Sequence, residues 1–183
     1  MTHNYPKEIF MKSILTIVFF SLISVPLFAE LPLGKKPPEI VLSGDLGGRL
    51  DTTPWSSSEI KGKVYILLYV DPDEKNLNNH VFRRLKKAGF PENKVGSIAI
   101  INMDASWAPN FAIESALKKK QKEYPDTIYV KDFDKVLVKQ WQLTDHSSDV
   151  LIFDREGYVI FSKDGKLTEN EIEQLLRVIR ENI

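Results

Sequence analysis

The chain has 183 residues, carries 25 Lys and Arg against 25 Asp and Glu, and contains no cysteine. The length fits one domain with or without a leader, and the balanced charge leaves no broad basic field for holding nucleic acid. Without cysteine the protein has no disulfide, thiol nucleophile, iron–sulfur cluster or thiolate metal site.

Residues 1–29 are predicted to be a secretory signal peptide, and residues 30–183 the mature domain. Lys12 comes before an apolar run over residues 14–25, and Ala29 offers a small residue for cleavage. The run is shorter than the roughly 20 residues that a membrane span needs. We therefore expect a periplasmic protein. The alternative is an uncleaved leader that anchors the chain to the membrane, and Met11 is an alternative start.

Strands and helices are predicted to alternate along the mature chain. Residues 64–70 form an almost wholly apolar run, which is typical of a central strand buried on both faces of a sheet. A helix is expected to follow, with an apolar stripe up to Ala88 and with Gly89 at its end. Residues 97–101 predict a second buried strand, and the next helix is expected to begin near Pro109.

The second half of the chain continues this alternation and ends in a hairpin and a helix. The predicted elements are a strand, a short helix and two further strands, at residues 127–130, 133–141, 150–153 and 158–161. Thr168 and Glu171 form a capping box at the start of the last helix. The order β-α-β-α-β-α-β-β-α predicts an α/β fold in which helices flank both faces of one central mixed β-sheet.

Several segments carry a resemblance to a known fold family. Residues 34–40 and 62–64, the turn at residues 154–157, and the strand at residues 64–70 with a helix directly after it resemble a thioredoxin-like domain of the exported, peroxiredoxin-related kind. Five further segments match in order and spacing, at residues 55–64, 74–76, 141–143, 147–148 and 163–168. Together they resemble the YtfJ family of exported bacterial proteins over almost all of residues 34–180. The resemblance implies a periplasmic thioredoxin-like protein without an established biochemical role, and no cofactor is expected.

The sequence departs from thioredoxin at two functional positions. The loop after residues 64–70 reads Asp71-Pro72-Asp73-Glu74-Lys75-Asn76 and lacks the cysteine pair, so no side chain can carry out dithiol exchange. Ser148 stands where thioredoxins have a cis-proline. A cis bond before a residue other than proline costs about 2.5–4 kcal/mol, and we therefore expect a trans peptide there.

Polar residues are expected to gather at the carboxyl ends of the predicted parallel strands, where α/β proteins bind ligands. Asp71 and Asp73 follow one strand, Asp104 follows its neighbour, and His146 and Ser148 come from the loop that faces Asp71 in a thioredoxin fold. These residues suggest a hard-cation site or a carboxylate–histidine acid/base pair. The alternative is a solvated loop in which polar residues simply form turns.

Two hypotheses for the function follow. The favoured one is a non-enzymatic module that keeps the scaffold and binds an exported protein or peptide, with exposed apolar surface near Trp107 and Ser147-Ser148. The alternative is a metal-dependent or acid/base enzyme that uses Asp71, Asp73, Asp104 and His146. The glycine-rich segment at residues 44–48 precedes no helix or phosphate-binding Lys, so it is predicted to be a hairpin turn rather than a phosphate loop.

Overall fold

The computed structural model of the chain describes residue 1 and residues 31–183. The signal peptide predicted over residues 1–29 therefore lies outside the described residues, except for Met1. Within the described part, no helix has the length and apolar character needed to cross a membrane.

Six strands form one mixed sheet in the order β2-β6-β5-β4-β7-β8. Their bounds are Gly47–Arg49 for β2, Val64–Val70 for β4, Val95–Asn102 for β5, Thr127–Asp132 for β6, Ser148–Phe153 for β7 and Val159–Lys163 for β8. The strands β4, β5 and β6 are parallel, whereas β2, β7 and β8 are each antiparallel to their neighbours. The predicted mixed sheet and its C-terminal hairpin are confirmed.

Strand β4 lies inside the sheet, between β5 and β7, as its apolar run predicts. Its side chains alternate between two cores: Ile66 and Leu68 pack on one face of the sheet, and Leu67 and Tyr69 on the other. A strand that supplies both cores cannot alternate apolar and polar residues, which is why its sequence reads as one apolar run.

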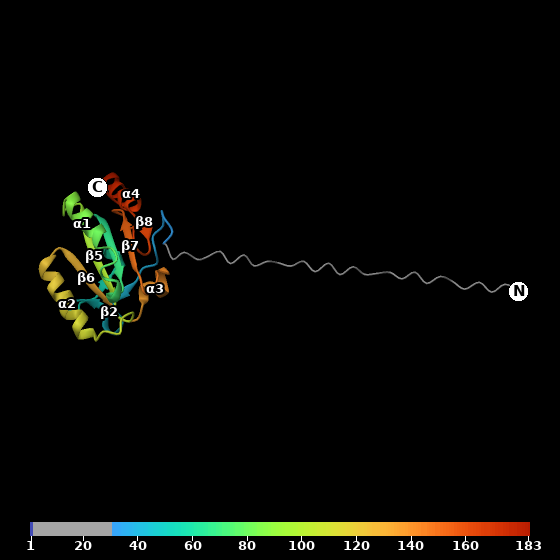
Figure 1. The fold of residues 1–183 in the computed structure, drawn as a ribbon, viewed down its shortest axis with the longest axis horizontal. Coiled ribbons are helices and arrows are strands. Elements are labelled where there is room, and N and C mark those ends of the chain that lie inside the picture. Colours follow the sequence, from blue (N-terminus) through green and yellow to red (C-terminus); the bar gives the residue numbers. More distant parts are fainter. Residues whose placement is uncertain (2–30) are drawn as a thin grey trace.

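Helices cover both faces of the sheet (Figure 1). One core holds apolar residues of α1 (Asn79–Ala88), α2 (Asn110–Glu123) and α4 (Glu169–Asn182). The other core holds α3 (Val136–Trp141) and a two-stranded ribbon of β1 (Val41–Leu42) and β3 (Trp55–Ser56). Three short 3-10 helices, η1, η2 and η3, lie at Gly44–Leu46, Ser57–Glu59 and Pro72–Glu74.

The local signals at element ends are confirmed. Gly89 closes α1 with a φ of 61° and Gly157 has a φ of 87° in the β7–β8 turn, both in the left-handed region that favours glycine. The Thr168 hydroxyl accepts a hydrogen bond from the backbone N–H of Glu171, and the Glu171 carboxylate accepts one from the backbone N–H of Thr168.

The hairpin turn predicted at residues 44–48 is wrong. Residues 44–46 form η1, and Gly47 and Gly48 begin the edge strand β2, which pairs with β6. A Cβ atom on Gly47 would lie 1.9 Å from the backbone oxygen of Lys131. Glycine is therefore required here because two backbones approach closely, and a composition rich in glycine does not distinguish that need from a turn.

Candidate functional site at the carboxyl edge of the sheet

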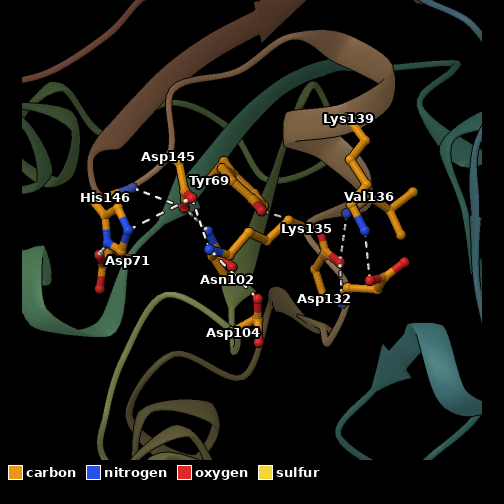
Figure 2. A network of polar contacts seen from close by, with 11 residues as sticks. Tyr69, Asp71, Asn102, Asp104, Asp132, Lys135, Val136, Lys139, Asp145 and His146 are labelled. Atoms are coloured by element: carbon orange, nitrogen blue, oxygen red, sulfur yellow. Dashed lines mark hydrogen bonds and ion pairs between the residues drawn. The ribbon is translucent and has the colours of Figure 1, made fainter.

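A network of polar side chains lies at the carboxyl edge of the parallel strands (Figure 2). Asp71 directly follows β4, Asn102 ends β5 and Asp132 ends β6. Because these strands are parallel, their carboxyl ends meet at one edge of the sheet, which is where α/β proteins bind ligands. The segment between α3 and β7 brings Asp145 and His146 to the same edge.

His146 lies between two carboxylates. Its Nδ1 is 3.3 Å from Oδ2 of Asp71, and its Nε2 is 3.7 Å from Oδ2 of Asp145. The Asp71 side chain is 3% exposed, whereas that of His146 is 66% exposed. His146 also has a φ of 55°, a left-handed conformation that is strained for any residue with a side chain. Asp71 thus orients an imidazole that remains open to solvent.

The loop of Asp71 is tied to the loop before β7. The backbone N–H of Asp71 donates to the carbonyl of Ser147 over 2.9 Å. Its Oδ1 accepts a hydrogen bond of 2.8 Å from the backbone N–H of Asp73, which caps η3. The first bond joins the two loops that correspond to the redox motif and the cis-proline of thioredoxins, and the second fixes the Asp71 side chain within its own loop.

Lys135 supplies the positive charge at the centre of the network (Figure 2). Its Nζ lies 2.8 Å from Oδ2 of Asp145 and 3.5 Å from Oδ2 of Asp104. The amide of Asn102 donates to the other oxygen of Asp145 over 3.0 Å. Burial favours the neutral acid, but the hydrogen bond and charge of Lys135 outweigh burial and hold the pKa of Asp145 below its usual range.

The structure brings only some of the predicted site residues together. Asp71 and His146 are in contact, but Asp73 accepts from the hydroxyl of Ser106 over 2.9 Å, and Asp104 faces Lys135. Among residues 31–183, no group of three or more His, Asp or Glu is arranged to hold a metal ion. An ammonium group already lies among the carboxylates, so this geometry gives the metal interpretation no support.

Ser148 has a structural partner. It is 2% exposed, and within the described part of the chain its hydroxyl accepts from the amide of Asn78 over 3.3 Å rather than contacting His146. The same amide donates to the carbonyl of Gly165 over 2.9 Å, and its oxygen accepts from the N–H of Leu167. The described residues contain no cis peptide bond, so the bond before Ser148 is trans, as expected.

Two buried acids are not among the site residues predicted from the sequence. Asp132 accepts from the Tyr69 hydroxyl over 3.1 Å, and its two oxygens also accept from the backbone N–H groups of Val136 and Leu137. Asp149 is 1% exposed, and one of its oxygens has no hydrogen-bond partner among the described residues. Burial, followed by the negative charge of Asp164, raises the pKa of Asp149 to about 8 against a weaker opposing backbone hydrogen bond.

Two aromatic side chains are exposed beside this network. Trp107 is 90% exposed in the β5–α2 loop, and Phe111 is 76% exposed in the first turn of α2. Each directly follows a residue that lines an open cleft of about 520 Å³. The cleft is lined by Gly44, Asp45, Met103, Asp104, Ser106, Asn110 and Phe133. Exposed aromatic side chains are therefore present at Trp107, as the binding hypothesis expects, whereas Ser148, near which it also expects apolar surface, is buried.

Solved structures share the fold of this chain. A thiol-disulfide isomerase from Corynebacterium glutamicum superposes with a TM-score of 0.54 at 17% identity, covering 76% of this chain and 95% of that one. A peroxiredoxin-like protein from Aquifex aeolicus has a TM-score of 0.55 at 17% identity, with 84% and 89% covered. Likeness at these identities shows the fold alone, and that fold is thioredoxin-like.

Sequence comparisons place the chain more narrowly. The "Uncharacterized protein YtfJ" of Escherichia coli strain K12 is 29% identical over 145 residues, which are 78% of this chain and 77% of that protein. An "Uncharacterized protein" of Haemophilus influenzae is 30% identical over 146 residues, 77% of each. The family model described as "Bacterial protein of unknown function (YtfJ_HI0045)" matches residues 36–182, nearly the whole domain. This chain therefore belongs to the YtfJ family.

Proposed function

We propose that this chain is an exported, periplasmic binding protein that holds a protein or peptide partner at the carboxyl edge of its sheet. It carries out no thiol–disulfide exchange, because the chain has no cysteine and Asp71 begins the loop where the redox motif of thioredoxins lies. An insulin-reduction assay should give no turnover above the blank, and turnover would contradict the proposal.

The exposure of Trp107 is the single observation that carries the binding role. Trp55 and Trp141 are 0% and 2% exposed, so the fold has room for tryptophan in its cores, yet Trp107 is left in water with Phe111 close by in sequence. Fully burying a large apolar side chain stabilises a complex by roughly 1.5–3 kcal/mol. Exposed apolar surface rimmed by polar groups is typical of an interaction site.

Selection of displayed random peptides on the purified protein tests this role. We expect enriched peptides to bind at least about 10-fold more weakly to the double variant W107S/F111S, because aromatic anchors dominate such interfaces. The matched control L33S/F82S removes two exposed apolar side chains elsewhere, 60% and 37% exposed, and should leave binding unchanged. Failure to enrich any peptide, or equal binding by W107S/F111S, would contradict the proposal.

Export rests on the leader sequence and has its own test. The charge at Lys12, the apolar run and Ala29 predict secretion and cleavage. In a bacterial host we expect the periplasmic fraction to contain a chain that begins at Glu30, identified by mass spectrometry of the intact protein. A full-length chain confined to the cytoplasm would refute export.

The contact between His146 and Asp71 favours one alternative, an acid/base enzyme. A buried carboxylate 3.3 Å from Nδ1 can orient the ring, and Nε2, which lies 3.7 Å from Oδ2 of Asp145, is beyond hydrogen-bond distance of that oxygen and can exchange protons with a substrate. This alternative predicts turnover of one class in a panel of carboxylic, phosphoric and amide esters, lost in both H146Q and D71N. Absence of turnover, or turnover that both variants retain, would exclude a role for this pair.

A further inference from the structure

We infer that the partner at this surface presents a Lys or Arg next to an apolar side chain; the inference rests on the proposed binding function and names the chemistry of the partner. Its basis is the juxtaposition of the two exposed aromatic rings with a cleft lined by acids. Trp107 directly follows the cleft residue Ser106, and Phe111 directly follows the cleft residue Asn110. The backbones of both aromatic residues therefore border the cleft, and their exposed rings are within reach of a segment that extends beyond it.

The cleft has a negative character. Its lining contains the carboxylates of Asp45 and Asp104 and, among the described residues that form it, no Lys, Arg or His. Asp45 is exposed, and the Asp104 side chain is 61% exposed. Asp73 adds a third carboxylate, because it accepts from the hydroxyl of the lining residue Ser106. Acidic surfaces of this kind attract cationic groups and repel anionic ones.

The nearby cations already have carboxylate partners. The Nζ atom of Lys131 lies 5.3 Å from the centre of the Phe133 ring, which lines the cleft, and pairs with Glu114 over 3.1 Å. Lys135 is shared, since its Nζ lies closer to Asp145, at 2.8 Å, than to Asp104, at 3.5 Å. His146 lies between Asp71 and Asp145 and does not line the cleft (Figure 2). A single ammonium group thus serves two carboxylates, and Asp104 keeps an exposed side toward solvent.

The same charges disfavour the other occupants of an aromatic surface. An anionic lipid surface would bring further negative charge against Asp45 and Asp104. A second copy docked by the same face would bring two sets of these carboxylates into one interface, since a twofold interface pairs a patch with itself. A segment that carries a cation beside an apolar side chain can pair with the carboxylates and also cover the aromatic rings.

Three synthetic peptides test the inference. They share a Leu-Phe core flanked on both sides by Lys, by Glu or by Ser, and contain no Trp, so that Trp107, the exposed tryptophan, reports binding by its emission. At low ionic strength we expect the Lys peptide to bind at least 10-fold more tightly than the Glu peptide, with the Ser peptide between them. The ratio of the two affinities should fall toward unity in 0.5 M salt. At about 0.15 M the Debye length is already about 8 Å, and a higher salt concentration screens the exposed charges further.

Matched variants locate the effect. We expect D45N/D104N to reduce the preference for the Lys over the Glu peptide to less than about 3-fold, while D126N/E181Q, which neutralises two exposed carboxylates elsewhere, leaves it unchanged. Equal binding of all three peptides would overturn the inference and leave the proposed function standing. Binding of none would overturn both. Trp107 emission that responds to anionic vesicles, or to protein concentration together with dimer formation in sedimentation, but to no peptide would equally overturn the inference.

Discussion

Asp132 is predicted to stabilise the fold more than any other residue of the polar network. It is 0% exposed, ends β6, and joins three elements through its side chain. The Tyr69 hydroxyl donates to Oδ2 over 3.1 Å, while the N–H groups of Val136 and Leu137 donate to Oδ1 and Oδ2 over 2.9 and 3.1 Å. Replacing Asp132 with Ala removes every acceptor at once.

The cost follows from what is left unpaired. Loss of a capping side chain at the start of a helix such as α3 costs about 1 kcal/mol. A buried hydroxyl left without an acceptor costs about 1–3 kcal/mol more, and Tyr69 is 1% exposed. Burial and the nearby Asp132 keep the pKa of Tyr69 above its ordinary value, so the phenol remains a donor and cannot escape this cost by ionising. We therefore expect D132A to lower the free energy of unfolding by about 3 kcal/mol.

Urea unfolding at pH 7, followed by circular dichroism, measures this loss. Tyr69→Phe should cost about 1 kcal/mol, because Asp132 keeps its backbone donors, the N–H groups of Asp134, Val136 and Leu137. In the double variant the two effects should not add, since Phe leaves no orphaned hydroxyl for D132A to expose. A loss below about 1 kcal/mol for D132A, or strict additivity with Tyr69→Phe, would refute the reasoning.

Three further predictions concern other parts of the fold. Because the pKa of Asp149 is raised to about 8, its carboxyl keeps a proton in the folded protein that the unfolded chain releases above about pH 4. The stability that the protonated Asp149 contributes is therefore present at low pH and is lost as the pH rises toward 8. Asp149→Asn should flatten the decline in unfolding free energy between pH 5 and 8 by up to about 1.4 kcal/mol per pH unit, and a slope parallel to the wild type would contradict this. Gly47→Ala should lower the free energy of unfolding by more than about 2 kcal/mol, measured by heat or urea, because the new Cβ would strike a backbone oxygen of β6. The control Gly165→Ala, at a φ of 74° but with open space around it, should cost only about 1–2 kcal/mol. Equal costs for the two variants would contradict the role given to the close backbone approach at Gly47. Asn78→Ala should cost about 2–3 kcal/mol because it orphans buried groups of the β8–α4 loop, and the exposed neighbour variant Asn79→Ala should cost under about 0.5 kcal/mol; similar losses would show that the buried amide is not what matters.

The sequence alone determined the elements whose residues share one local pattern. The apolar run at residues 64–70 predicted a strand buried on both faces, and β4 lies inside the sheet because it supplies side chains to two cores. Gly89 and the Thr168 capping box marked helix ends, since each satisfies backbone groups within a few residues of itself. Such signals are readable because the interactions behind them are short-range along the chain.

Tertiary structure decided which polar residues meet. The sequence predicted a polar pocket at the carboxyl edge and its Asp71 and His146, because the order of parallel strands already places their ends together. It did not predict that Lys135 lies between Asp104 and Asp145, or that Ser148 pairs with Asn78, 70 residues away. Those contacts depend on how far each side chain reaches across neighbouring elements, and no local spacing encodes that distance.

Strand β2 also shows the difference between what local sequence predicts and what the tertiary structure decides. Gly47 looked like part of a turn because glycine is common in turns, but its role depends on the backbone of β6, more than 80 residues later, passing too close for a Cβ atom. Local sequence determines what a segment can form. Only the packed structure determines which distant backbone or charge it must accommodate, because those free energies arise when the elements come together.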